Sequence, residues 1–299
     1  MCTLTIIPMP SNGVQLAFNR DESRTRAAAL PPRKRRFGNR VAILPTDPTS
    51  GGTWLGVNDA GLVLGVLNVN LPSTRRPTPP APLPSDRARS AECGARNEEA
   101  ELKSAFGLPL RVPGSALRPP FDGRGAGRVG FPPRSRGEII PSLLDCDSPS
   151  AALAACEKLN YRDFAPFRLV LVGAGIVADV RWDGDEPMVM SRLLGSTPLM
   201  FTSSGLGDDL VEGPRRGLFA EMFAGGPETW VAAQRAFHRH AWPDREHLSV
   251  NMSRATARTV SYAVVDVCAT EADFTYHADA PNRHAQTTTV CIPLTPGAA

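Results

Sequence analysis

The sequence predicts an α+β protein in which antiparallel β-sheets are packed between helices. Three observations favour this class. Short, apolar, β-branched runs are joined by tight turns, as in antiparallel hairpins. These runs are apolar at nearly every position, which is typical of sheets covered on both faces. The elements follow the order strands, helices, strands, which differs from the alternation of a βαβ protein.

Three hairpins are predicted first. They join residues 3–7 to 14–18, residues 53–57 to 62–67, and residues 167–172 to 176–182. A helix that starts at Asp147-Ser148-Pro149 is expected to reach about residue 159, because Ser and Asp favour N-caps and Pro favours the first turn. Short strands near Met188 and Met200, helices over 214–223 and 227–241, and strands over 259–267, 274–277 and 287–292 complete the prediction.

Residues 72–137 interrupt this pattern. Five prolines fall between residues 77 and 84, and a Gly-Arg-Gly stretch lies at 123–125. Proline removes backbone donors and glycine costs conformational entropy, so the composition predicts a surface insertion with one short helix over 98–106. Because the strand pattern resumes afterwards, we expect one domain, residues 1–299, that carries this insertion.

The charge and the cysteines exclude several classes of protein. Thirty-three Lys and Arg against 30 Asp and Glu leave a net charge of +3, which requires no nucleic acid partner. No apolar run reaches the length of about 18 residues that a membrane-spanning helix needs. The first ten residues lack the basic and apolar regions of a secretory signal, so we expect a cytoplasmic protein whose six cysteines are free thiols.

One segment, residues 23–40, carries seven basic residues and no acidic one. A run of this kind favours a solvated loop. The alternative is a basic rim that attracts an anionic ligand.

Cys2 carries most of the chemical information. Removal of Met1, which is expected when the second residue is small, leaves a cysteine with both a thiol and a free α-amine. The pKa of an α-amine is about 7.7–8.0. The amine can therefore take the thiol proton, directly or through water, and the terminal cysteine becomes a nucleophile with its own base. The alternative is an ordinary thiol near a frayed terminus.

The first hairpin predicts the surroundings of Cys2. A turn centred near Asn12 pairs residues whose numbers sum to about 23 or 24, which puts Cys2 opposite Asp21 with Arg20 and Glu22 beside it. A carboxylate there can hold the α-ammonium, and a guanidinium can lower the pKa of the thiol or hold an anionic reactant. The alternative is a solvated strand end with surface ion pairs.

Asn68 ends the second strand of the second predicted hairpin. Acyl transfer needs hydrogen-bond donors for an oxyanion. A polar amide at the end of an apolar strand needs partners, and lining a cleft is one way to find them. The alternative is a turn-forming asparagine.

Three segments together resemble the NRDE family, also called the transport and Golgi organisation protein 2 family. They are Met1-Cys2-Thr3, Asn19-Arg20-Asp21-Glu22, and the run Gly-Gly-Thr-Trp-Leu-Gly-Val-Asn at 51–58 that continues to Asn68. The resemblance covers most of the chain, including Arg136-Gly137-Glu138. It implies a fold similar to the N-terminal nucleophile hydrolases, a four-layer αββα sandwich. It also implies roles in haem trafficking and in lipid or secretory homeostasis.

The choloylglycine hydrolases are the better-understood relatives that this resemblance brings in. Their pattern implies Cys2 as the nucleophile, Asp21 as the carboxylate that positions the amine, and Asn68 as an oxyanion donor. Their arginine three residues before the aspartate is replaced here by Phe18, which leaves Arg20 as the candidate.

Four further residues are candidates for binding. Asn19 and Glu22 belong to the Asn-Arg-Asp-Glu motif, and Ser203 stands where those hydrolases have a second oxyanion asparagine. Arg258 falls where the NRDE family has an arginine before a late strand.

Two functions follow as hypotheses. The first is an N-terminal-cysteine hydrolase that cleaves an amide or related acyl bond of a small, anionic or acyl-containing ligand, without a cofactor. The second is a non-catalytic protein that binds or carries haem or an acyl lipid. No metal site is expected, because His238 and His240 lie about 200° apart on the predicted helix. We expect these histidines to stabilise the helix C-terminus as cations.

Overall fold

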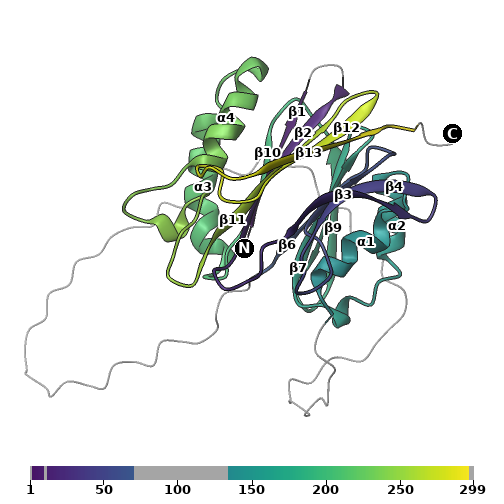
Figure 1. Cartoon of the computed structure of the whole chain (residues 1–299), viewed down its shortest axis with the longest axis horizontal. Helices are drawn as coiled ribbons and strands as arrows, with labels where there is room; N and C mark the ends of the chain where they lie inside the picture. The colour runs from purple at the N-terminus through teal and green to yellow at the C-terminus, as the bar shows by residue number, and fades with distance from the viewer. Residues whose placement is uncertain (1, 10–11, 71–133, 296–299) are drawn as a thin grey trace, which may run out of the picture.

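Two antiparallel β-sheets stack face to face in the computed structural model, which describes residues 2–9, 12–70 and 134–295 (Figure 1). The first sheet has the strand order β10-β1-β2-β11-β12-β13 within the described residues. Its strands are β1 (Cys2–Pro8), β2 (Val14–Ser23), β10 (Leu199–Ser203), β11 (Ala257–Val267), β12 (Glu271–His277) and β13 (Thr287–Pro293). Strands from the beginning and the end of the chain therefore share one sheet.

The second sheet has the order β3-β4-β5-β6-β7-β8-β9 over the same part of the chain. Its strands are β3 (Leu30–Phe37), β4 (Arg40–Thr46), β5 (Leu55–Asn58), β6 (Val63–Asn68), β7 (Phe167–Gly173), β8 (Ile176–Trp182) and β9 (Pro187–Leu193). Every strand in this order is hydrogen-bonded to its neighbour in sequence, so the sheet is a meander.

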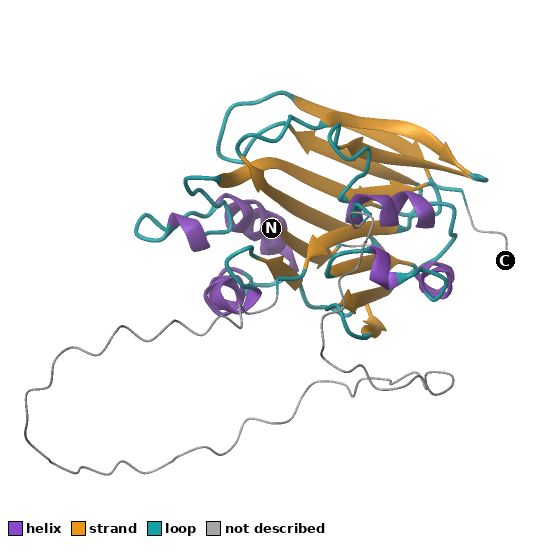
Figure 2. Ribbon diagram, turned by 90° about the horizontal axis from the view of Figure 1, so that it is seen from below, coloured by secondary structure: helices purple, strands orange, loops and turns teal. Residues whose placement is uncertain are grey.

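Helices cover both sheets (Figure 2). The helices α3 (Asp208–Met222) and α4 (Pro227–Arg239) contact β10, β1 and β2 of the first sheet. The helices α1 (Ile139–Leu143) and α2 (Pro149–Cys156) contact β6, β7 and β8 of the second sheet. None of the helices in the described residues combines the length and the apolar composition that a membrane crossing requires.

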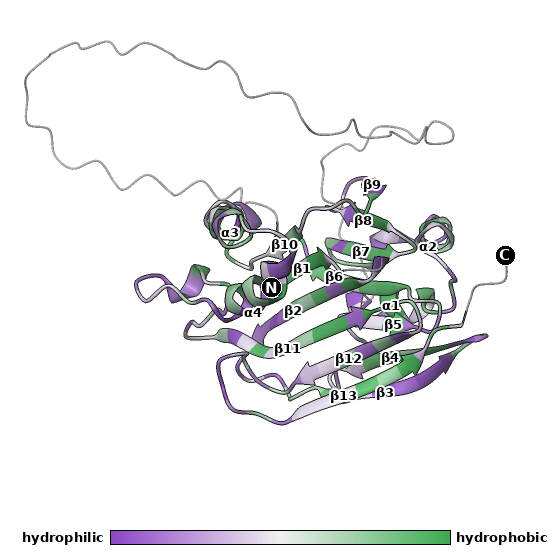
Figure 3. Ribbon diagram, turned by 90° about the horizontal axis from the view of Figure 1, so that it is seen from above, coloured by the Kyte–Doolittle hydropathy of each residue, from purple (hydrophilic) through white to green (hydrophobic). Residues whose placement is uncertain are grey.

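The core lies between the sheets, and Gly65 of β6 shows how closely they approach. A Cβ atom on Gly65 would lie 3.4 Å from Leu4 of β1 and 3.7 Å from Phe18 of β2. On the opposite face of the same sheet, a Cβ atom on Gly56 would lie 3.3 Å from Ile140 of α1. Each face of this sheet therefore has its own packing partner, which explains the nearly continuous apolar strands coloured as hydrophobic in Figure 3.

Most predicted elements are confirmed. The three hairpins are β1-β2, β5-β6 and β7-β8, and the helix predicted from residue 147 is α2, whose N-cap Ser148 accepts a hydrogen bond from Ala151 N. The helix predicted over 214–223 begins six residues earlier, at Asp208, and contains Pro214 in its interior.

The basic segment 23–40 was predicted as a loop, and this prediction is wrong. Most of it forms β3, an edge strand paired with β4, and the side chains of Arg33, Lys34, Arg35 and Arg36 are exposed. Basic side chains on an edge strand discourage pairing with another sheet. Pro31, Pro32 and the run of charges hide the strand from a prediction that relies on apolar alternation.

Most of the predicted insertion, including the helix expected over 98–106, lies outside the described residues. Its last residues, predicted as part of the loop, belong to the fold. Arg134 forms a β-bridge with Phe164, and Arg136–Glu138 form a short 3-10 helix, η2. A reciprocal capping box between Ser135 and Glu138 holds the start of η2.

Candidate active site

Cys2 is the first residue of β1, between Arg20 of β2 and Ser203 of β10. Its side chain is 7% exposed and belongs to the core between the sheets. The predicted pairing of Cys2 with Asp21 is wrong by one residue, because the paired numbers sum to 22. Since side chains alternate along a strand, Arg20 shares the face of Cys2, and Asp21 lies on the face that the helices cover.

Ser203 is the closest polar partner of the Cys2 main chain. The Cys2 backbone nitrogen donates a hydrogen bond to Ser203 Oγ at 3.1 Å, and Ser203 is 1% exposed. A hydroxyl that accepts one hydrogen bond keeps its own proton to donate elsewhere. Ser203 can therefore hold the Cys2 nitrogen and still donate to an oxygen that reacts at the thiol.

Asp21 lies in a buried polar layer between β2 and α3. Thr259 Oγ1 donates a hydrogen bond to Asp21 Oδ1 at 2.6 Å. Burial raises the pKa of Asp21, and the positive charge of Arg215 opposes that shift. The carboxyl group thus sits beneath the start of β1 with a cation from α3 as its electrostatic partner.

Arg215 is a site residue that the sequence did not reveal. It is fully buried in α3, and its guanidinium donates to Thr3 Oγ1 at 2.9 Å and to Thr202 Oγ1 at 2.6 Å. These two threonines follow Cys2 and precede Ser203, so Arg215 joins the two strands that carry the site. In the sequence Pro-Arg-Arg-Gly, nothing distinguishes Arg215 from the exposed Arg216.

Arg20 faces the space between the sheets, but its charge has a partner in the scaffold. Its guanidinium binds the buried carboxylate of Asp47, lies 3.6 Å from Glu22, and stacks 4.2 Å from the centre of the Trp54 ring. Arg26 also donates to Asp47, at 2.7 Å. Arg20 therefore connects β2 to the loop before β5.

Asn19 and Arg258 also contact the scaffold. Asn19 Nδ2 donates to the backbone oxygens of His238 and Val250, at 2.8 and 3.0 Å, and fastens β2 to α4 and to the segment before β11. Arg258 binds Asp279 and donates to the Thr259 backbone oxygen at 2.9 Å.

Asn68 is the half-buried last residue of β6, and the two residues after it connect the sheets. Val69 N donates to the Pro166 backbone oxygen at 3.1 Å, on the side of the second sheet. Asn70 N donates to Asp208 Oδ2 at 3.2 Å, and Ser204 N donates to Oδ1 of the same carboxylate at 2.7 Å. The end of β6 is thus tied to the residue that follows Ser203.

The thiol of Cys2 is not acidic in this environment. Burial raises the pKa of Cys2, and the negative charge of Asp21 acts in the same direction, although the positive charge of Arg20 opposes them. A buried thiol of this kind needs a nearby base to become a nucleophile. An α-amine on Cys2 itself is the base that the sequence suggests.

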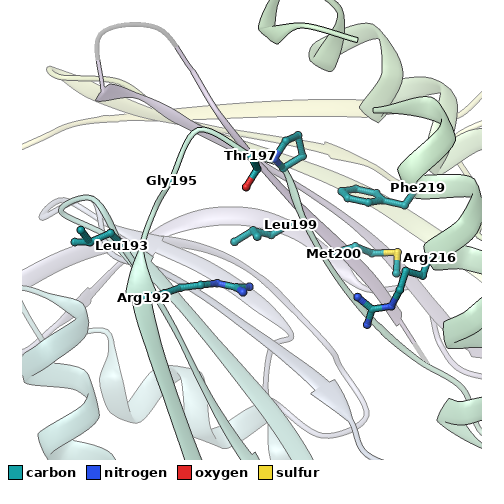
Figure 4. Close-up of a pocket in the computed structure, with 9 residues that line it drawn as sticks. Arg192, Leu193, Gly195, Thr197, Leu199, Met200, Arg216 and Phe219 are labelled. Atoms are coloured by element: carbon teal, nitrogen blue, oxygen red, sulfur yellow. The ribbon is translucent and has the colours of Figure 1, made fainter. Parts of the chain in front are cut away.

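A cavity of about 330 Å³ lies at the other end of β10 (Figure 4). Leu199 and Met200 line it together with Arg192, Arg216 and Phe219. Because Ser203 is four residues from Leu199 on an extended strand, this cavity is separate from the surroundings of Cys2. In the described part of the chain, no group of three or more His, Cys, Asp or Glu side chains is arranged to hold a metal ion.

No protein-family model matches the chain, and no curated protein matches it. Among solved structures, the chain is similar to two of the conjugated bile acid hydrolase from Clostridium perfringens, each of an altered form of that enzyme. The first is 11% identical and covers 97% of this chain and 92% of that chain, with a TM-score of 0.46. The second is 10% identical, with coverage of 96% and 92% and a TM-score of 0.46.

Proposed function

We propose that this chain is an N-terminal-cysteine hydrolase of the NRDE family with the four-layer αββα fold, and that it cleaves an amide or related acyl bond. The observation that carries the proposal is the position of Cys2. Its nitrogen lies 3.1 Å from Ser203 Oγ, at the start of a strand where two sheets meet. The NRDE assignment is supported by the segments quoted above from the sequence, from Met1-Cys2-Thr3 to Asn68.

The reaction starts from a chain that begins at Cys2. The α-amine takes the thiol proton, and the sulfur attacks the acyl carbon to form a tetrahedral intermediate. Ser203 and Asn68 are the candidate donors to its oxyanion. The intermediate collapses to a thioester while the ammonium gives its proton to the leaving nitrogen. A water molecule, deprotonated by the same amine, then releases the acid and restores the thiol.

Asp21 and Arg215 position the nucleophile in this proposal. The carboxylate of Asp21 is the candidate partner of the α-ammonium, and Arg215 holds Thr3 and Thr202 on either side of the site. Ordering the terminal residue in this way keeps the thiol and the amine in a reactive arrangement.

The test combines intact mass with acyl capture. We expect the purified protein to lack Met1 and to form a mass adduct on the N-terminal peptide when exposed to a panel of activated acyl esters. The adduct is expected to be absent in Cys2→Ala and to persist in Cys156→Ala, a matched control for another buried cysteine. Retention of Met1, or adducts that are unchanged in Cys2→Ala, would contradict the proposal.

A further inference from the structure

Arg136 lies beside the candidate active site without a role in the scheme above. Its Nη1 donates to the Pro166 backbone oxygen at 2.9 Å. The same oxygen accepts the hydrogen bond from Val69 N, at 3.1 Å. Two donors that share one oxygen are close neighbours, so the guanidinium of Arg136 lies next to the residue that follows Asn68.

The segment that carries Arg136 is packed against the scaffold by two glycines. Thr53 N donates to the Gly137 backbone oxygen at 3.0 Å. A Cβ atom on Gly52 would lie only 2.5 Å from the Gly137 carbonyl carbon, so the two chain segments touch at their backbones. Together with the capping box of Ser135 and Glu138, these contacts fix where the side chain of Arg136 starts.

The charge of Arg136 has no direct carboxylate partner within the described residues, where the ion pairs up to 4.0 Å do not include it. The side chain is half-buried. Burial lowers the pKa of Arg136, while the charges of Cys2 and Glu22 raise it. A partly desolvated guanidinium near a thiol, with one of its five N–H groups bound to Pro166, favours an anionic ligand.

We propose that Arg136 is the anion-binding residue of the Cys2 site, and that the substrates are acyl compounds with a carboxylate close to the scissile bond. The inference rests on the proposed function, because it takes Cys2 as the reacting group. The carboxylate would receive the remaining N–H groups of Arg136 while the acyl carbon meets the thiol. Arg20, in contrast, is already bound to Asp47.

The test uses two alkylating reagents of similar size and different charge. Iodoacetate and iodoacetamide both transfer their methylene carbon to a thiolate and release iodide, but only iodoacetate carries a carboxylate. The rates of both are measured at Cys2 in the full chain by peptide mass spectrometry. The exposed Cys268 in the same molecule supplies the reference, so the ratio of the two rates at Cys2 relative to Cys268 reports charge recognition alone. The assay needs the thiol and does not need a free α-amine.

We expect the ratio to favour iodoacetate at Cys2 by about fivefold at low salt, the size of one partly screened ion pair, and to shrink at high salt. Arg136→Gln is expected to bring it close to one. Arg136→Lys, which keeps the charge, is expected to preserve most of it. Arg162→Gln, at an exposed arginine of η3 (Tyr161–Asp163), is the matched control and is expected to change nothing.

The outcomes separate the two proposals. An equal ratio in the wild-type protein and Arg136→Gln overturns the anion site, even if Cys2 acylation is observed. A charge preference that depends on Arg136 supports the anion site, even if no acyl turnover is found. No reaction of Cys2 with either reagent overturns both proposals, because it shows that the thiol is closed to ligands.

Discussion

The backbone nitrogen of Cys2 and the hydroxyl of Ser203 are joined by a 3.1 Å hydrogen bond, although 201 residues separate them in the sequence. The bond places the start of β1 against the end of β10, so a serine from the late part of the chain controls the nitrogen that would become the catalytic base.

Ser203→Ala removes this hydrogen bond and a candidate oxyanion donor. We expect acylation of Cys2 to slow by about a hundredfold, the usual effect of losing one oxyanion donor. The measurement is the rate of adduct formation on the N-terminal peptide. Ser191→Ala on β9 is the control, because Ser191 is exposed and on the other sheet. An unchanged rate in Ser203→Ala would assign the hydrogen bond to structure alone.

Asp21→Asn tests the buried charge pair beneath the site. Arg215 is fully buried, and Asp21 is the largest source of the favourable charge that raises its pKa against the effect of burial. Leaving that cation without its partner is expected to cost about 3–5 kcal/mol of unfolding free energy, measured by urea denaturation. Asp185→Asn, at an exposed turn, is expected to change it by less than about 0.5 kcal/mol. A small effect in Asp21→Asn would show that the charges are not coupled.

His238 is expected to make the protein less stable below neutral pH. It was predicted to be a cation at the end of its helix, which is wrong. It is fully buried, and burial lowers its pKa to about 3. Gln234 Nε2 donates to Thr5 Oγ1 at 2.9 Å, which leaves the Thr5 hydroxyl to donate to His238 Nε2 at 2.8 Å. The folded state therefore favours the neutral ring.

The sign follows from the lowered pKa. Between about pH 6.5 and pH 3 the unfolded chain binds one more proton at this position than the folded chain, so stability falls as pH falls. This group alone should remove about 2 kcal/mol between pH 7 and pH 5. His238→Gln should flatten the pH dependence of urea denaturation by that amount, and His284→Gln, at an exposed histidine, should leave it unchanged. Equal slopes in all three proteins would refute a neutral His238.

Gly52→Ala tests the contact that positions Arg136. The added methyl would lie 2.5 Å from the Gly137 backbone, so the two segments must move apart. We expect a loss of about 1–3 kcal/mol of unfolding free energy and a reduced preference of Cys2 for iodoacetate. Gly217→Ala in α3 has nothing within 4 Å of the new methyl and is expected to stabilise the protein by up to about 1 kcal/mol. An intact charge preference in Gly52→Ala would show that this contact does not position Arg136.

The hairpins could be predicted because each is a local event. Apolar, β-branched runs flank turn residues, and those signals lie within a few residues of one another. The pair β3-β4 was missed because the exposed face of an edge strand carries charges in place of an alternating apolar pattern. Helix α3 was predicted too short because Pro214, normally a helix start, lies in its second turn.

The register of the first hairpin could not be predicted to within one residue. Met9 N donates to Gly13 O, which closes a loop centred one residue earlier than expected. A shift of one residue exchanges the two faces of a strand, and it moved Arg20 to the side of Cys2 and Asp21 to the side of the helices. The residue types of the site were therefore predictable, whereas their orientation was not.

By itself, the sequence determined the order of strands and helices and singled out Cys2, because local propensity and the chemistry of a terminal cysteine are written in neighbouring residues. The tertiary structure alone decided which charged residues surround it. Arg215 and Arg216 are adjacent in the chain, yet the rotation of α3 against β10 buries the first and exposes the second. Burial and partners, which set the electrostatics of the site, arise only when distant strands and helices pack together.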